Sequence, residues 1–421
     1  MQLVLITDRY APEARAAAYL FRGLAEGLAQ RGHTVTVLTR YPDRFVPKDD
    51  RRPLPTAETL NGVEVVRVDG LFNGSWPPLR ALDQAAVSLR IGMRLLRSRR
   101  PDAVLVSSPP LPMILAAVIK KKLHRTPYVI HLHDLYPQTA IDLGVLKNSC
   151  LIWLLRWIER VAYLNSGRIV AAAPATLEIL KGYPGLGEGH VSFVDNFVDL
   201  RDCAREGRGS SFRERWKLGK EFVILYAGLM GAAQDMGVII ECARRCADRP
   251  DWRFVFAGDG IRSEEVRAAA CSLPNVRHLG CLPNDQYFAA LQACDVALVA
   301  LDPALKVPAV PGKVPTIMAS GKPFVAAIPE GNDTREIASR SGGGLAVNAG
   351  SADQLCEALD LLYREPDRRH AMGAKGKRFA REHCSLESAV AKFERELERV
   401  ADKKLSMSVD GRLGRTSGAG L

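Results

Sequence analysis

Short runs of apolar residues alternate with longer helical patterns along most of this sequence, and no other feature limits the fold as strongly. A strand pattern at 2–7, a helical pattern at 16–33 and a second strand pattern at 34–39 follow one another closely. This succession predicts a parallel βαβ unit. Further strand patterns occur at 63–68, 103–108, 128–133, 168–173 and 191–195. Because these runs are continuously apolar rather than alternating, we expect helices to cover both faces of the sheet.

A second series of the same kind begins near residue 221. Its strand patterns lie at 222–228, 253–260, 276–280, 296–301, 323–328 and 344–348. Helical patterns lie between them at 238–247, 263–273, 284–294 and 352–365. A chain of 421 residues is too long for one ordinary core. We therefore predict two doubly wound, Rossmann-like α/β domains, with ligands bound in the interdomain cleft at the carboxyl ends of strands.

The polar segment 199–220 separates the two series and is the predicted linker. The N-terminal domain accordingly covers 1–198, and the C-terminal domain covers 221–384. An amphipathic helix is expected at 385–404. The polar segment 405–421, rich in Gly and Ser, is expected to be disordered.

The cysteines and the apolar runs indicate a cytoplasmic protein that does not span a membrane. The nine cysteines are scattered and form no CxxC pair. Cys242 and Cys246 lie one helical turn apart, but no nearby His or Cys completes a metal set, so we interpret the cysteines as reduced core thiols. The first residues, MQLVLITDRY, read as a buried strand rather than a signal peptide. No apolar run is long enough for a transmembrane helix.

The net charge of +11 is unevenly distributed. Between 71 and 125, ten basic residues are offset only by Asp83 and Asp102. Such a surface suits anionic lipid or a phosphorylated substrate, and a solvated basic face is the alternative. Nucleic acid is disfavoured because no RNA-binding motif occurs. The helical segments 79–98 and 151–164 combine arginines with Leu or Trp, and each is compatible with a lipid headgroup region or with simple core packing.

Three glycine-containing turns follow strands of the second series. They are AGLMGAAQD (227–235), FAGDGIR (256–262) and VPGKVPTIMASG (310–321). Glycine allows close backbone approach, and the N-terminus of a helix attracts anions, although plain structural turns have the same composition. In the third turn, Lys313 adds a cation that can meet a diphosphate as a point charge, and we expect the N–H groups of Lys313 and Val314 to be unpaired there.

The segment HLHDLYPQTAIDLG (131–144) follows a strand pattern and supplies further candidates. We expect His133 and Asp134, which are nearer the strand end than His131, to enter the cleft; a buried core histidine is the alternative. Several fingerprints are missing from the sequence: GxxxxGK[ST], GxGxxG after the first strand, GxSxG and HExxH. Their absence argues against ATP hydrolysis, nicotinamide chemistry, a serine hydrolase and a zinc protease.

These segments together resemble the GT-B-fold, family 4 retaining glycosyltransferases. Within that family they are similar to the bacterial surface-polysaccharide branch that includes L-fucosamine transferases. The resemblance covers roughly residues 1 to 400 and is carried by YAPEARAAAYLFRGLAEGLAQRGHTVTVLT, HDLYPQTAIDLGVLKN, VSFVDNFVD, LYAGLMGAAQD, FAGDG, VPGKVPTIMASGKP and RRHAMGAKGKRFAREHCS.

The resemblance implies a nucleotide-sugar donor on the C-terminal domain and an acceptor on the N-terminal domain, with the last helix crossing back to the latter. His133 and Asp134 would contact the transferred sugar and the acceptor. The donor diphosphate would lie near Gly231, Gln234, Gly312 and Lys313. The nucleoside would lie near Gly258, Asp259, Gly260, Cys281 and Leu282.

Four positions depart from the pattern of the wider family. Leu229 and Gln234 stand where most members have Arg and Lys, and Pro308 and Thr316 stand where they have two glutamates. Lys313 is then the expected catalytic cation, with His133 as the second catalytic candidate. The expected substitutes for the glutamates, in contact with sugar hydroxyls, are Asn332, Asp333 and Glu336. No metal and no cofactor are expected.

The leading hypothesis is sugar transfer with retention from a nucleotide diphosphate sugar to a lipid-linked acceptor, such as an undecaprenyl-diphosphate-linked saccharide. The resemblance suggests an N-acetylated amino sugar such as FucNAc and a role in lipopolysaccharide, O-antigen or capsule synthesis. The enzyme would lie peripherally on the inner face of the cytoplasmic membrane. The alternatives are a nucleotide-sugar 2-epimerase on the same fold and a degenerate, non-catalytic partner.

Overall fold

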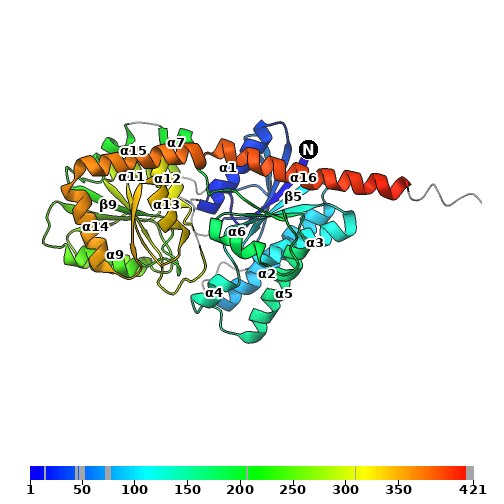
Figure 1. The fold of residues 1–421 in the computed structure, drawn as a ribbon, viewed down its shortest axis with the longest axis horizontal. Helices are drawn as coiled ribbons and strands as arrows, with labels where there is room; N and C mark the ends of the chain where they lie inside the picture. The colour runs from blue at the N-terminus through cyan, green and yellow to red at the C-terminus, as the bar shows by residue number, and fades with distance from the viewer. Residues whose placement is uncertain are drawn as a thin grey trace, which may run out of the picture.

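The computed structural model describes residues 1–13, 16–42, 46, 53–71, 77–204, 207–308 and 310–413. The chain forms two parallel-sheet α/β domains side by side, as the sequence predicts (Figure 1). Most strand patterns recognised in the sequence are strands of the structure, within about two residues at each end, as is usual for element boundaries.

The N-terminal sheet has eight strands in the order β3-β4-β2-β1-β5-β6-β7-β8. All neighbours pair in parallel except β3 and β4. The strands are β1 (Gln2–Ile6), β2 (Thr34–Arg40), β3 (Ala57–Leu60), β4 (Val63–Val68), β5 (Ala103–Ser108), β6 (Tyr128–Leu132), β7 (Arg168–Ala171) and β8 (Val191–Phe193). The helices of this domain are α1 (Ala16–Gln30), α2 (Pro77–Arg97), α3 (Leu111–His124), α4 (Gln138–Asp142), α5 (Ser149–Asn165) and α6 (Pro174–Lys181).

The C-terminal sheet has six parallel strands in the order β11-β10-β9-β12-β13-β14. They are β9 (Phe222–Ala227), β10 (Trp252–Ala257), β11 (Val276–His278), β12 (Val296–Ala300), β13 (Phe324–Ile328) and β14 (Gly344–Asn348). The helices are α9 (Met236–Arg245), α10 (Ser263–Ser272), α11 (Asn284–Ala293), α12 (Lys313–Ala319), α13 (Asp333–Ser341), α14 (Ala352–Arg364) and α15 (Pro366–His383). The strand order reverses beside β9, so the carboxyl ends of β9, β10 and β12 form the switch point at which ligands bind in such sheets.

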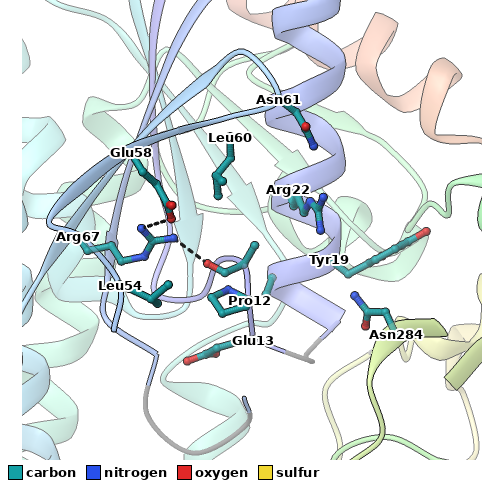
Figure 2. Close-up of a pocket in the computed structure, with 12 residues that line it drawn as sticks. Pro12, Glu13, Tyr19, Arg22, Leu54, Glu58, Leu60, Asn61, Arg67 and Asn284 are labelled. Carbon is teal, nitrogen blue, oxygen red and sulfur yellow. Dashed lines mark hydrogen bonds and ion pairs between the residues drawn. The ribbon is translucent and has the colours of Figure 1, made fainter. Parts of the chain in front are cut away.

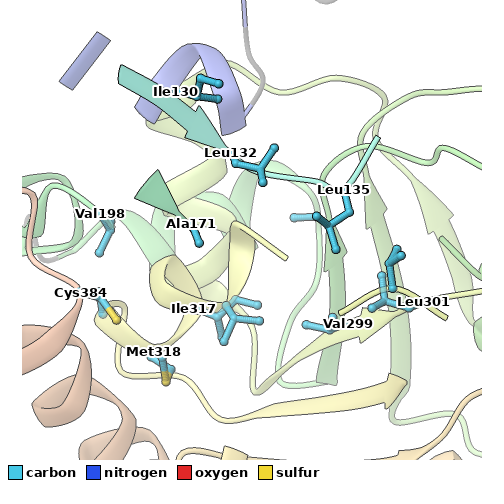
Figure 3. Close-up of a cluster of buried hydrophobic side chains, with 14 of the residues drawn as sticks. Ile130, Leu132, Leu135, Ala171, Val198, Val299, Leu301, Ile317, Met318 and Cys384 are labelled. Atoms are coloured by element: carbon cyan, nitrogen blue, oxygen red, sulfur yellow. The ribbon is translucent and has the colours of Figure 1, made fainter. Parts of the chain in front are cut away.

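Every residue of the central strands β5, β6, β9, β12 and β13 is buried, which explains their continuous apolarity. One buried apolar cluster extends across the domain boundary. It joins residues of β6 and β7 to residues of β12 and α12 (Figure 3). A direct hydrogen bond accompanies this contact, because Asn196 Nδ2 donates to Val310 O at 2.9 Å. The two domains therefore share apolar packing beneath the cleft.

The segment predicted as a linker folds as two short helices, α7 (Leu200–Ala204) and α8 (Arg208–Arg215). Helix α8 packs on α11, with Phe212 buried and Arg213 paired to Asp295 at 2.8 Å. A Cβ at Gly209 would lie 2.9 Å from the carbonyl of Gln292, so the two helices are in close contact. The segment is polar because these helices lie on the surface, and it belongs structurally to the C-terminal domain.

The final helix, α16 (Leu386–Leu413), leaves the C-terminal domain and lies along α1 (Figure 1). Glu394 accepts from Arg31 and contacts His33 Nε2, both at 2.7 Å, and Glu396 accepts from Arg168 at 2.6 Å. The structure continues this helix past 404 to Leu413, whereas the sequence predicts a disordered segment from 405. No proline occurs there to end it. The rest of the predicted tail, 414–421, lies outside the described residues.

Candidate active site

Three loops at the carboxyl end of the C-terminal sheet pack directly on one another. Gly228 N donates to Ala257 O at 2.8 Å, and Gly258 N donates to Gly280 O at 2.7 Å. A Cβ at Gly258 would lie 1.9 Å from Gly228 O, and the φ angle of Gly258 is 148°. Only glycine meets both requirements without displacing the neighbouring backbone. The glycines noted in the sequence therefore bring the ends of β9, β10 and β11 together.

A cavity of about 410 Å³ lies between these loops and the N-terminal domain. The predicted site residues that line it are Gln234, Gly258, Asp259, Cys281, Leu282, Gly312, Lys313 and Asp134. Thr316 also lines it, so this position still faces the cavity although it carries no carboxylate. The structure thus brings most of the predicted donor-binding residues to one place, together with one predicted acceptor residue.

Lys313 is the first residue of α12 and points into the cavity beneath Gly228. Its Nζ lies 3.7 Å from the centre of the Tyr226 ring. The residue as a whole is partly exposed, but its Nζ is shielded from solvent and has no hydrogen-bond partner among the described residues. Burial lowers the pKa of Lys313 to about 7. An ammonium held in this way gains strongly from an anionic ligand, because nothing else neutralises its charge.

The turn around Lys313 differs from the prediction in one respect. Val314 N donates to Pro311 O at 3.0 Å, so this N–H group is not available to a ligand. Gly231 N likewise donates to Gln234 Oε1 at 2.9 Å. Gly231 and Gly260 are not among the described residues that line the cavity. Gly260 instead packs against the backbone of Met230, where a Cβ would lie 2.2 Å from the carbonyl oxygen.

His133 is not among the described residues that line the cavity. Its ring centre lies 4.0 Å from that of His131 and 6.0 Å from that of Phe21, because residues two apart on a strand share a face. Burial lowers the pKa of His133 to about 4, so the imidazole is neutral at neutral pH. Burial raises the pKa of Asp134, the next residue, which does line the cavity.

Asn332, Asp333 and Glu336 lie at the start of α13, and Asp333 takes part in a domain contact. Asn332 caps the helix by accepting from Thr334 N at 3.0 Å. The Asp333 carboxylate accepts from Ala175 N in the other domain at 3.1 and 3.3 Å. None of the three is among the described residues that line the cavity. Their expected contact with sugar hydroxyls is therefore not visible in this arrangement.

The N-terminal domain contributes a second cation that the sequence analysis missed. Arg9 follows β1 and lines the cavity, with its guanidinium paired to Asp8 at 2.9 Å and to Glu13 at 3.0 Å. Tyr19 of α1 lines the cavity as well and donates to Asp202 at 2.9 Å. Arg9 lies outside the stretches that carry the family resemblance, and Tyr19 lies inside one of them but has no motif of its own. Position alone could have pointed to Arg9, because it follows the first strand at the carboxyl edge of its sheet.

A second cavity, of about 280 Å³, adjoins the first (Figure 2). Tyr19 and Asn284 line both cavities. Arg67 lies fully buried at its wall, paired to Glu58 at 2.6 Å and donating to Ala11 O at 3.0 Å. The remaining polar residues that line this cavity are Glu13, Arg22 and Asn61. It therefore offers charged donors and acceptors next to the larger cavity.

The helical layer formed by α2, α3 and α5 exposes apolar and basic side chains together. Helix α3 packs between the other two. On α5, Trp153 is 68% exposed and Trp157 is 50% exposed, and the neighbouring Arg156 and Arg160 are exposed too. Leu89 on α2 and Leu123 on α3 are each 66% exposed. We call this set the α2–α3–α5 face. Among the described residues, no helix has the length and apolarity needed to cross a membrane.

The basic residues of segment 71–125 do not all contribute to this face. Lys120 is buried and donates to Leu95 O at 2.9 Å and Ser98 O at 3.0 Å, where α2 ends. Arg90 donates to Gly70 O at 3.0 Å. Asp83 is buried as well, in an ion pair with Arg40 at 2.9 Å, so it offsets no surface charge. Arg94, Arg97, Lys122 and Arg125 remain exposed.

Comparison with known proteins connects this geometry to sugar transfer. Residues 16–196 match a model of the glycosyl transferase 4-like domain, and residues 221–365 match a model of glycosyl transferases group 1. The probable glycosyltransferase WbjE of Pseudomonas aeruginosa is 27% identical over 278 residues, which are 63% of this chain and 68% of that protein.

Among solved structures, Anabaena HepE in complex with UDP and glucose has a TM-score of 0.72 at 15% identity, over 94% of this chain and 99% of that one. The UDP-GlcNAc 2-epimerase of Neisseria meningitidis has a TM-score of 0.60 at 13% identity, over 95% and 100%. These likenesses establish the fold, and the two family models establish the class. The chain belongs to the glycosyltransferases of GT-B fold, with a glycosyl transferase 4-like domain followed by a group 1 domain.

Proposed function

We propose that the enzyme moves a sugar from a nucleotide diphosphate sugar to a lipid-linked saccharide, with retention, in the synthesis of a bacterial surface polysaccharide. The observation that carries this proposal is the solvent-shielded, unpaired Nζ of Lys313 in the interdomain cavity. A diphosphate is an anionic ligand that such an ammonium can meet as a point charge. The loops after β9, β10 and β11 would hold the nucleotide, as the resemblance implies.

Cleavage of the bond between the sugar and the diphosphate depends more on stabilising negative charge on the diphosphate than on proton transfer at the sugar. When the bond between the anomeric carbon and the diphosphate oxygen breaks, the electron pair leaves with the diphosphate. Lys313 and Arg9, which line the same cavity, would stabilise the developing negative charge. The acceptor hydroxyl would attack from the side on which the diphosphate leaves and pass its proton to the departing phosphate. No metal is required, because these cations supply the charge.

The second cavity is the proposed site for the sugar end of the acceptor. It adjoins the donor cavity through Tyr19 and Asn284. Saccharides present alternating donors and acceptors, and the cavity supplies Arg22, Glu58 and Asn61 for these groups. Asp134 faces the donor cavity from the N-terminal domain and would contact the transferred sugar.

The α2–α3–α5 face is the proposed contact with the membrane that holds the lipid-linked acceptor. Exposed tryptophans next to arginines suit the headgroup region, where the ring stays partly apolar and the guanidinium meets anionic lipid. Trp153 and Trp157 together with Arg156 and Arg160 provide this pairing on one helix. The enzyme would then bind peripherally to the inner face of the cytoplasmic membrane.

The donor is tested by calorimetry with a panel of UDP-, GDP-, dTDP- and CMP-sugars, among them an N-acetylated amino sugar such as UDP-FucNAc. We expect one class of nucleotide diphosphate sugar to bind. Absence of any binding would support a degenerate, non-catalytic partner. Incubation of the bound sugar nucleotide with membrane extracts is then followed by NMR. Formation of a glycoside with the anomeric configuration of the donor is expected, whereas an inverted centre at C2 of the sugar nucleotide would instead identify an epimerase.

Membrane contact is tested by sedimentation with vesicles that contain an anionic phospholipid. The wild-type chain should sediment with these vesicles and remain in solution with purely zwitterionic ones. Trp153→Ala combined with Trp157→Ala should weaken sedimentation several-fold. Ile261→Ala, which changes an apolar residue that is 69% exposed in the other domain, is the matched control and should have no effect. Equal sedimentation of both variants would refute a role for this face.

A further inference from the structure

Three cysteines that are distant in the sequence meet at one point between α9 and α14. Cys242 lies on α9, Cys246 is the residue that caps the C-terminus of that helix, and Cys356 comes from α14. The Sγ atoms of Cys356 and Cys242 are 2.9 Å apart, and those of Cys356 and Cys246 are 4.0 Å apart. All three sulfur atoms lie within 4.8 Å of one another. Cys356 is 114 residues away from Cys242, so no local spacing in the sequence indicates this partner.

Two of the three sulfur atoms lie closer together than independent thiols normally do. Non-bonded carbon atoms rest about 3.5–4.0 Å apart and sulfur is larger, so 2.9 Å is too close for two independent thiols. Three sulfur atoms about 2.3 Å from one central ion lie at most about 4 Å from each other. Small shifts of side chains would therefore place all three at a common ion. A disulfide would account for only two of them.

The surroundings suit a soft ion rather than a hard one. Cys242 and Cys246 are buried and Cys356 is half-buried among apolar residues of the C-terminal core. Two ion pairs connect the end of α9 and the residues that follow it to α14. They join Arg245 to Asp353 and Arg249 to Asp360. Both carboxylates are thus held by arginines. Among the described residues, no fourth His, Cys, Asp or Glu joins the group.

We propose that Cys242, Cys246 and Cys356 form a three-sulfur binding site for a thiophilic metal ion, with monovalent copper as the best match. Soft thiolate ligands select Cu(I) and Zn(II), but structural zinc is almost always bound by four ligands. Three sulfur atoms without a fourth ligand favour Cu(I). None of the three cysteines lines either cavity, so the site is independent of donor binding.

The test is an anaerobic titration of the full chain with Cu(I) against a chromophoric Cu(I) chelator. A thiol assay in urea first confirms that all nine cysteines are reduced. We expect one Cu(I) per chain to resist the chelator, with an ultraviolet thiolate-to-copper band. The melting temperature should rise on binding, because the ion connects α9 to α14. The same titration with Zn(II) should give weaker binding.

Variants distinguish this site from the other thiols. Cys356→Ser changes the half-buried member of the group, so folding should survive, and it should reduce chelator-resistant copper at least tenfold. Cys271→Ser, which changes an exposed cysteine of α10 in the same domain, is the matched control and should bind like the wild type. Equal copper binding by both variants, or no resistant copper in the fully reduced wild type, would overturn the proposal. A Cys242–Cys356 disulfide that forms in air while the reduced chain binds no Cu(I) would overturn it too.

Discussion

The two walls of the interdomain cavity are built in different ways. The C-terminal wall is built on loops that pack backbone against backbone, with glycines where they touch, and among its described lining side chains Lys313 is the cation. The N-terminal wall consists of side chains from the loop after β1, from α1 and from the end of β6, among them Arg9, Tyr19 and Asp134. Backbone geometry tolerates few changes of sequence, whereas side chains can be exchanged singly.

This difference suggests a division of labour. Every nucleotide diphosphate sugar presents the same diphosphate, so a wall of fixed backbone with one cation suits the donor. Acceptors differ in their sugars, so a wall of exchangeable side chains suits the acceptor. If the two walls divide the work in this way, substitutions in the C-terminal wall should lower stability or turnover. Substitutions in the N-terminal wall should mainly change the affinity for substrate.

The largest effect is expected from Gly258→Ala. The new Cβ would lie 1.9 Å from Gly228 O at a φ of 148°, so the loops must separate. Overpacking and backbone strain together should lower the free energy of unfolding by about 2–6 kcal/mol. Urea unfolding followed by circular dichroism measures this loss. Gly280→Ala is the control: its φ is also positive but no atom lies within 4 Å of its Cβ, so it should lose only about 1–2 kcal/mol. Equal losses of unfolding free energy in the two variants would mean that the close contact between the loops does not stabilise this wall.

Lys313→Ala should lower the turnover number of sugar transfer by about 10²–10³-fold, the usual cost of losing a group that stabilises transition-state charge. The fold should not suffer, because the substitution removes a shielded, unpaired ammonium. Initial rates with the donor found by calorimetry measure the first effect, and the unfolding midpoint measures the second. Lys220→Ala, at an exposed lysine, is the control. If the variant transfers sugar at a rate within a few-fold of the wild type, Lys313 is not the catalytic cation of the C-terminal wall.

The affinity for a nucleoside diphosphate should fall as pH rises above about 7. In the free protein, burial lowers the pKa of Lys313 from 10.5 to about 7, so the side chain loses its proton above that pH. A bound diphosphate favours the charged form, so binding takes up a proton and Kd should rise by at most about tenfold per pH unit. The same lysine destabilises the empty fold below pH 7, and this penalty declines as pH rises from 7 to 10.5, because the unfolded chain holds the proton in that window and the folded chain does not.

Calorimetry in two buffers of different ionisation enthalpy measures the proton uptake at pH 8. Lys313→Arg is the control, because a guanidinium stays charged and should give a flat pH profile. A wild-type profile that is equally flat from pH 7 to 9 would show that Lys313 already carries its charge in the empty site.

The sequence predicts the C-terminal wall better than the N-terminal wall for a physical reason. Strand patterns locate the turns that follow them, and glycine marks the turns where backbones touch, so Gly258 and Lys313 are found from local residues alone. Arg9 belongs to a loop without such a pattern, and only the assembled sheet shows that it faces the same cavity. Asp333 at the start of α13 shows the opposite case, in which a local pattern points to the site but the side chain is used elsewhere. It follows a strand end as expected, yet its carboxylate accepts a hydrogen bond from Ala175 N across the domain contact.

Segment 199–220 shows a second limit of prediction from local residues. Its polarity predicts a linker, but the same polarity is found in short helices that lie on a surface and bury a single residue such as Phe212.

The three cysteines between α9 and α14 show a third limit of prediction from local residues. A cluster assembled from positions 114 residues apart leaves no spacing that could be recognised in the sequence.

The smallest effect is expected from Arg9→Ala in the N-terminal wall. Asp8 and Glu13 already pair with the Arg9 guanidinium at 2.9 and 3.0 Å, so part of its charge is neutralised before a diphosphate arrives. Donor affinity should therefore fall by only about three- to tenfold, in line with the net value of about one hydrogen bond. Arg381→Ala, at an exposed arginine of α15, is the control. Combining Arg9→Ala with Lys313→Ala in a double-mutant cycle shows whether the two cations act on the same phosphate. If Arg9→Ala alone costs as much as Lys313→Ala, the two walls share the diphosphate equally, and the division between a donor wall and an acceptor wall fails.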